Sequence, residues 1–218
     1  MEKTTITKVT LDEARELYNS HNKTLKELAL KCFSGNELKL PSFSEIKTFE
    51  DAVKALEMDI DDANAIVNTL KKTSKATAAM YKLNIVRKAL NYWHDLHLTK
   101  DPEDSYIYYP YNPFVTKSST YYKSDINSGK MEIIGKIRCE EKEYNVLGGD
   151  APDGSIAGLG YFHSSYGVGG AYADFGFLGC ANKKIAQHLS RYFGMLITEA
   201  EYGDMFDFEV IEDKYGNV

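Results

Sequence analysis

Few residues of this chain have the spacing that catalysis requires. The first candidate is a cysteine near the start of an expected helix. Cys180 lies just before an expected helix N-terminus, where the helix dipole would stabilise a thiolate. His163 and His188 are the histidines nearest to it in the sequence, and an enzyme built around this thiol would need one of them as its base. A cysteine in this place is more commonly a small buried residue, and the sequence favours that interpretation.

Two histidines three positions apart, His94 and His97, could hold a metal ion on one face of a helix. No cluster of cysteine or histidine supports them, so we expect packed or solvent-facing rings and no metal site. We expect no cofactor either. The two G-x-G stretches, at 158–160 and 167–169, do not complete a dinucleotide-binding motif and lack the lysine of a phosphate loop.

The most unusual stretch covers residues 148–179, which hold ten of the sixteen glycines and no lysine or arginine. Glycine weakens helices and strands alike, so this stretch is expected to be mostly turns and loops, which at this length often bind something. Tyrosine is favoured at recognition surfaces. The sequence therefore predicts a ligand- or partner-binding surface here, with equal weight for the alternative that the rings pack the loops onto a sheet. Its candidate residues are Tyr161, Phe162, His163, Tyr166 and Tyr172.

The first hundred residues have helical periodicity. Thr10 and Glu13 form a capping-box pattern before the first helix, and a second helix follows at 23–33, with Cys32 on its apolar face and Gly35 as its terminator. A short helix is expected at 49–58. Residues 60–97 are helical in pattern, with Asp59 as the cap and a polar break at 71–75 that favours two helices over one.

After residue 100 the pattern changes to strands. Tyrosine-rich segments with Pro110 and Pro113 predict an edge strand or an extended loop. The stretches 131–139 and 142–148 predict a hairpin that turns near Glu140. An amphipathic helix capped by Asn182 and a last strand at 207–211 complete the chain. The apolar face of this helix is expected to comprise Ile185, Ala186, Leu189, Phe193, Leu196, Ile197 and Ala200.

Helices followed by strands indicate an α+β fold. It has an N-terminal helical part, 1–100, and a mainly antiparallel, β-rich part with a C-terminal helix, 101–218.

The charge of the chain bears on its partners and its compartment. The net charge is −6, and residues 101–218 hold 10 basic and 18 acidic residues, so this half would repel phosphate groups. A nucleic-acid-binding protein is the weaker alternative, and it would use the basic side chains of the helices, which more commonly form a solvated face. These are Lys71, Lys72, Lys75, Lys82, Arg87 and Lys88.

Three widely separated cysteines suit a reducing compartment. Neither a secretory leader nor an apolar run long enough to span a bilayer is visible, so the sequence predicts a cytoplasmic protein with no membrane partner.

Three segments resemble uncharacterised proteins encoded by phages and prophages of Bacteroidetes. They are LDEARELYNSHNKTLKELALKCFSGNEL, ATAAMYKLNIVRKALNYW and FGFLGCANKKIAQHLSRYFGMLI, which together cover about half of the chain. The shared motifs are packing patterns. The resemblance implies a phage- or prophage-derived protein that is non-catalytic and acts in particle assembly or as a binding accessory, in the cytoplasm or within a virion. The tyrosines of the Gly-rich stretch suit a protein or a glycan as its partner. An enzyme with a loop-built site near Cys180 and His163 is the alternative.

Overall fold

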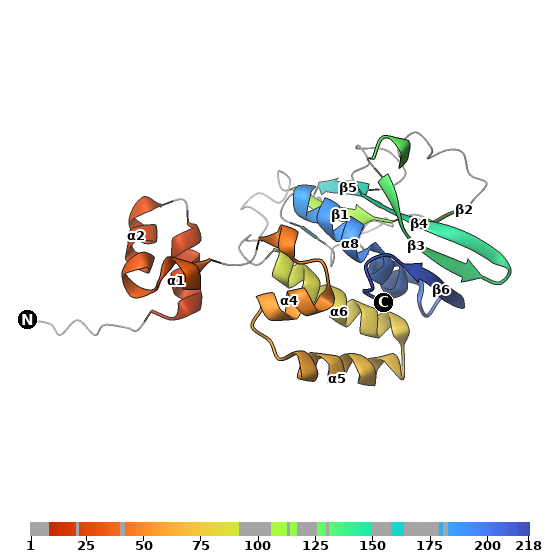
Figure 1. Cartoon of the computed structure of the whole chain (residues 1–218), viewed down its shortest axis with the longest axis horizontal. Coiled ribbons are helices and arrows are strands. Elements are labelled where there is room, and N and C mark those ends of the chain that lie inside the picture. The colour runs from red at the N-terminus through yellow and green to blue at the C-terminus, as the bar shows by residue number, and fades with distance from the viewer. Residues whose placement is uncertain are drawn as a thin grey trace, which may run out of the picture. The chain divides into compact units, whose positions relative to one another are not determined.

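The computed structural model describes residues 9–20, 22–39, 42–91, 106–112, 114–116, 126–129, 131–149, 158–163, 179–180 and 183–218. The chain forms two compact units, Met1–Ser42 and Phe43–Val218. Helices come first and antiparallel strands follow with one more helix, so the fold is α+β, as the sequence predicts (Figure 1). The boundary expected near residue 100 falls outside the described residues and stays a prediction.

Three helices form the first unit: α1 (Leu11–Asn19), α2 (Lys23–Cys32) and α3 (Gly35–Leu38). The predicted capping box before α1 is confirmed. The backbone N–H of Thr10 donates to the Glu13 carboxylate at 2.8 Å, and the Glu13 N–H donates to the Thr10 hydroxyl at 3.3 Å. The small core of this unit consists of Ala14, Ala29 and Leu38, all of which are buried.

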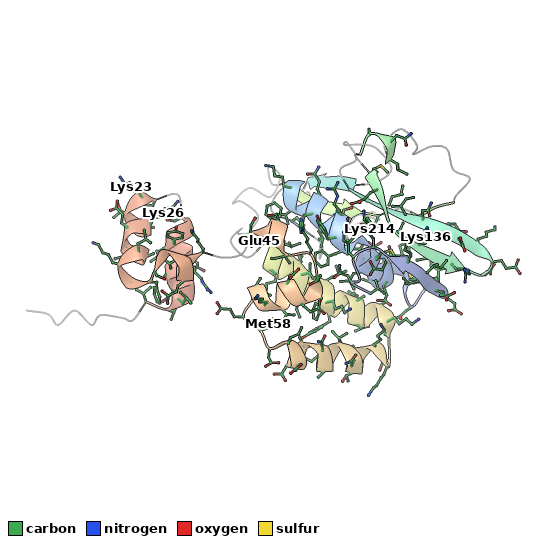
Figure 2. The ribbon with its side chains drawn as sticks, in the orientation of Figure 1. Lys23, Lys26, Glu45, Met58, Lys136 and Lys214 are labelled. Carbon is green, nitrogen blue, oxygen red and sulfur yellow. The ribbon has the colours of Figure 1, made fainter. Side chains whose placement is uncertain are left out.

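Two expectations for the first unit are wrong. Gly35 does not terminate α2 but begins α3, because Ser34 and Glu37 form a second capping box that starts a new helix there. Cys32 is exposed rather than part of the core, since Ala29 is the buried residue of α2 and Cys32 lies at the last position of that helix. Lys23 and Lys26 are exposed on the same helix (Figure 2).

The helical layer of the second unit follows a single turn of 3-10 helix at Phe43–Glu45. It consists of α4 (Phe49–Ala55), α5 (Ile60–Lys71) and α6 (Lys75–Leu90). Asp59 caps α5, as predicted, by accepting hydrogen bonds from the backbone N–H groups of Asp61 and Asp62. The predicted break between two helices is also confirmed. Ser74 caps α6 by accepting the Thr77 N–H at 2.8 Å, so the polar break is a helix start.

The long helix α8 (Lys183–Tyr202) lies at the centre of the second unit, between the helices and the sheet (Figure 1). Ile185, Leu189, Phe193 and Leu196 are 0% exposed and share a core with α4, α5 and α6, which confirms the predicted apolar face. Met195, on the other side of α8, packs against the sheet. The expected cap of this helix, Asn182, lies outside the described residues. None of the helices that the structure describes is long and apolar enough to cross a membrane.

Four antiparallel strands form the main sheet, in the order β2–β4–β3–β6. Their bounds are β2 (Phe114–Thr116), β3 (Met131–Cys139), β4 (Lys142–Gly149) and β6 (Phe208–Asp213). The predicted hairpin is therefore present, and it turns at Glu140, whose φ of 53° is left-handed. The last predicted strand is present as β6.

A separate pair of antiparallel strands, β1 (Tyr106–Tyr111) and β5 (Gly158–His163), joins the tyrosine-rich segment to the glycine-rich stretch. Within the stretch 148–179, for which mostly turns and loops are expected, β5 is a strand, because pairing with β1 supplies backbone hydrogen bonds that do not depend on side chains. Residues 150–157 and 164–178 lie outside the described residues, so the expectation for them stays a prediction. Pro110 lies within β1, which pairs with β5 alone among the described strands and is therefore an edge strand, as predicted.

The helix α8 crosses the sheet at close range because a glycine lies at the crossing. A Cβ atom added to Gly194 would lie 2.3 Å from the Asn112 Nδ2 atom and 2.3 Å from the Ile134 Cδ1 atom. The buried Asn112 side chain donates hydrogen bonds to the carbonyl oxygens of Leu147, at 2.9 Å, and Ser190, at 3.0 Å. These contacts tie the end of β1 to both β4 and α8, and so position the β1–β5 pair.

Candidate functional site

The predicted recognition residues are only partly described. Tyr161, Phe162 and His163 lie in β5, where the structure gives their backbone, and Tyr166 and Tyr172 lie outside the described residues. In the register, Tyr161 lies opposite Tyr108, Phe162 opposite Ile107 and His163 opposite Tyr106. The strand pairing thus brings two aromatic-rich segments together that are about fifty residues apart in the sequence.

Cys180 is a buried core residue. It is 0% exposed, and burial raises the pKa of its thiol to about 12, against smaller opposite effects of a hydrogen bond with Asn91 and of the Arg87 charge. The thiol is therefore protonated at neutral pH, and the activation that a helix start could give is absent. The interpretation of Cys180 as a small packed residue is confirmed.

His188, the histidine nearest to Cys180 along α8, is also engaged in packing. Its Nε2 atom lies 2.6 Å from the Ile46 carbonyl oxygen, and its ring lies 4.5 Å from the Tyr192 ring and 5.6 Å from the Phe43 ring, centre to centre. Burial lowers the pKa of His188, so the ring is neutral at pH 7. These contacts make the His188 ring part of the packing between the helices.

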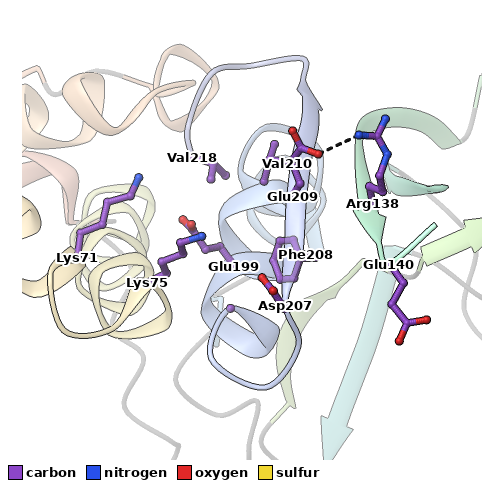
Figure 3. A pocket seen from close by; sticks show the side chains of 11 residues that line it. Lys71, Lys75, Arg138, Glu140, Glu199, Asp207, Phe208, Glu209, Val210 and Val218 are labelled. Carbon is purple, nitrogen blue, oxygen red and sulfur yellow. Dashed lines mark hydrogen bonds and ion pairs between the residues drawn. The ribbon is translucent and has the colours of Figure 1, made fainter. Parts of the chain in front are cut away.

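A hollow that the sequence did not predict opens where α5, α6, α8 and β6 meet. Its volume is about 730 Å³. Lys71 ends α5, Lys75 begins α6, and Glu199 reaches it from α8 (Figure 3). Its apolar wall consists of Phe208, Val210 and Val218. A smaller hollow of about 350 Å³ adjoins it and shares Lys71, Lys75, Gly203, Asp207 and Phe208.

The turn after α8 fixes one rim of this hollow. The Ser74 hydroxyl donates to the Asp204 carboxylate, and the Ala76 N–H donates to the same carboxylate at 3.4 Å. Gly203 permits the approach, since a Cβ atom there would lie 2.4 Å from the Glu199 carbonyl oxygen and 3.3 Å from the Ala76 nitrogen. The start of α6 and the turn after α8 are thereby held together, with the two lysines beside them.

Glu199 is the buried charge of the hollow. The residue as a whole is only 7% exposed. Its carboxylate forms no hydrogen bond or ion pair with another described residue. Burial raises its pKa, and the positive charges of Lys71, Lys82 and Lys75 oppose that rise. The carboxylate therefore lies in the field of three ammonium groups, each more than 4 Å from its oxygens.

Lys82 lies deeper than the other two lysines. Its Nζ atom donates to the Asn217 carbonyl oxygen at 2.9 Å and lies 5.7 Å from the centre of the Phe49 ring. Burial and the nearby charge of Lys71 lower the pKa of Lys82. Lys82 is thus partnered within the protein, whereas Lys71 and Lys75 are exposed and line the hollow.

A second hollow, of about 540 Å³, contains a carboxylate that is fully partnered. Glu132 of β3 lies 2.9 Å from the Arg191 Nε atom, accepts a hydrogen bond from the Tyr215 hydroxyl at 2.9 Å, and pairs with Lys214. Because all of its charge is compensated, Glu132 links β3, α8 and the segment after β6 rather than offering a group to a ligand.

The basic residues considered for nucleic-acid binding lie in different surroundings. Lys72 and Lys88 are exposed, whereas Arg87 is half-buried and its Nε atom has no hydrogen-bond partner among the residues that the structure describes. With Lys82 engaged by Asn217, the six side chains do not form one exposed row. His94 and His97 lie outside the described residues, and no group of three metal-binding side chains occurs within the described ones.

Sequence reasoning missed the Glu199 hollow, although one signal was present. Glu199 lies three positions after Leu196, so a carboxylate falls within the apolar stripe of a helix that is buried on this side. Its lysine neighbours come from two other helices, and only the folded chain brings them to it. Comparisons of this chain with protein-family models, curated proteins and solved structures find no match.

Proposed function

We propose that this chain is a phage- or prophage-derived protein that acts by binding rather than by catalysis, in particle assembly or as an accessory. Its recognition surface is formed by the Gly/Tyr-rich stretch around Tyr161, Phe162, His163, Tyr166 and Tyr172, and its partner is a protein or a glycan. It works in the cytoplasm of the host cell or within the particle. The resemblance of three segments to phage and prophage proteins supports the origin.

The observation that carries this proposal is the pairing of β5 with β1. Residues directly opposite in antiparallel strands occupy one face, so the positions of Tyr108 and Tyr161 fall together, and those of Tyr106 and His163 follow on the same face. Tyrosine combines a flat apolar ring with a polar tip and loses little entropy when it is fixed, which suits a recognition surface.

The state of Cys180 supports binding over the enzyme alternative. A nucleophile needs access to its substrate and a thiolate that forms near neutral pH. Cys180 is 0% exposed, and burial raises its pKa to about 12. A site near Cys180 and His163 would therefore need a different nucleophile from the one that the sequence offers.

The test compares a triple variant with wild type in two measurements. Tyr161→Ala, Tyr166→Ala and Tyr172→Ala are combined, and unfolding in urea and binding to a glycan array and to proteins of the bacterial host are measured. Surface substitutions change the free energy of unfolding by about 0.5 kcal/mol or less each, whereas deletion of a core aromatic costs about 3–5 kcal/mol. We expect a stable variant that has lost the glycan or host protein bound by wild type.

A matched triple variant with phenylalanine at the same positions keeps the rings and removes the hydroxyl groups, and it should retain part of the binding. A collapse in the stability of the alanine variant would show that these tyrosines anchor the loops. Undiminished binding by a stable alanine variant would place the recognition surface elsewhere.

A further inference from the structure

The carboxylate of Glu199 opens onto the hollow without a partner from the protein. Its oxygens are not among the fully buried polar atoms that lack a hydrogen bond in the described part of the chain, so they reach the space of the hollow. Glu199 is 7% exposed, none of its hydrogen-bonding capacity is used by the described residues, and its side chain lines the hollow of about 730 Å³. The group is placed to receive a donor or a cation that enters from the hollow.

The two lysines of the hollow likewise have no carboxylate partner among the described residues. Lys71 and Lys75 lie within electrostatic range of Glu199, yet neither forms an ion pair of 4 Å or less with any described carboxylate. Figure 3 shows the side-chain ends of Lys75, from α6, and Glu199, from α8, next to each other in this view, with Lys71 further away. A cationic end and an anionic end thus face the same space without closing on each other.

The remaining charges of the hollow narrow the choice of ligand. Arg138 is neutralised by Glu209, at 2.9 Å, and by Glu143, at 3.2 Å. The lysines would repel a simple cation, and the carboxylates of Glu199, Asp207 and Glu140, which also line the hollow, would repel a simple anion such as phosphate. A ligand with both charges on neighbouring atoms satisfies both ends.

We propose that the hollow binds a free α-amino acid, whose carboxylate is held by Lys71 and Lys75 and whose ammonium group is held by Glu199. Its side chain lies along the apolar wall of Phe208 and Val210. The Glu199 residue is 7% exposed, and a charge-assisted hydrogen bond to it is stronger than one at the open surface. This site is independent of the recognition surface at β1 and β5, and the two proposals can fail separately.

The experiment uses the full chain and the twenty amino acids one at a time. Thermal unfolding at 5 mM ligand, pH 7.5 and low salt finds the preferred amino acid, and calorimetry gives its dissociation constant. Two analogues of that amino acid follow: the N-acetyl form lacks the ammonium group, and the amide form lacks the carboxylate. We expect each analogue to bind at least tenfold more weakly. Equal binding of either analogue, or no binding by any of the twenty, would overturn the proposal.

Three variants test the residues. Glu199→Gln and Lys75→Met should each weaken binding at least tenfold, and Lys72→Met is the control, because Lys72 is exposed, neighbours the hollow in sequence and does not line it. Lys75 is exposed, so its variant stays folded even where the Glu199 variant does not. Unchanged affinity in Lys75→Met, or an equal loss in Lys72→Met, would contradict the assignment.

Discussion

The close crossing of α8 over the sheet makes Gly194→Ala a test in which two effects have opposite signs. Alanine is favoured over glycine within a helix by about 1 kcal/mol, so helix propensity alone predicts a more stable protein. Against this, the new methyl group would lie 2.3 Å from both the Asn112 Nδ2 and the Ile134 Cδ1 atoms, far inside van der Waals contact. Either α8 or these two side chains must move.

The cost of that movement exceeds the gain. Overpacking a dense core costs about 1–3 kcal/mol. Displacing Asn112 also leaves the buried carbonyl groups of Leu147 and Ser190 short of a donor, at about 1–3 kcal/mol. After the propensity gain is subtracted, we expect Gly194→Ala to lower the free energy of unfolding by about 1–5 kcal/mol.

Urea titration followed by circular dichroism measures this change. Ala65→Gly, at an exposed position within α5, measures the propensity effect by itself and should cost about 1 kcal/mol. A Gly194→Ala protein that is as stable as wild type, or more stable, would mean that α8 does not approach the sheet as closely as the structure shows.

Four further outcomes follow from burial and charge. Leu189→Ala should lower the free energy of unfolding in urea by about 2–5 kcal/mol, whereas the exposed Ile66→Ala should change it by about 0.5 kcal/mol or less. Cys180 should react with a thiol reagent only after unfolding, as read by mass spectrometry of the labelled peptide. Burial raises the pKa of Glu201 from 4.5 to about 7, so the folded state binds its proton more tightly than the unfolded chain does. Its effect therefore makes stability fall as pH rises from 4.5 through 7, and Glu201→Gln should flatten that slope in a series of urea titrations. Dialysis against EDTA should leave the melting temperature unchanged, and a fall of several degrees would reveal a structural metal.

Local signals predicted much of the helical structure. The caps at Thr10 and Asp59 are complete within four residues of sequence, and the apolar spacing of α8 repeats over about four turns, so no distant partner is needed to recognise either. Gly35 shows where a local signal is insufficient. The capping residues on both sides of it start a new helix, and their preference outweighs the tendency of glycine to follow one.

Features that depend on distant parts of the chain were not predictable in this way. The strand β5 exists through its pairing with β1, and its own glycines argue against a strand. The Glu199 hollow combines the end of α5, the start of α6, the end of α8 and β6, none of which indicates the others in the sequence. The sequence signal for this hollow is a single carboxylate, Glu199, within the apolar stripe of α8.

The central position of α8 has a consequence for how the chain is made. Residues 183–202 supply the core against which the helices between 49 and 90 pack, so those helices leave the ribosome about a hundred residues before their main partner is synthesised. Until then their apolar faces have no cover from α8. Contacts between residues so distant in sequence slow folding, and they prolong the lifetime of aggregation-prone intermediates with exposed apolar surface. The helical layer is therefore a natural client for chaperones during translation, and its final packing waits for one late helix.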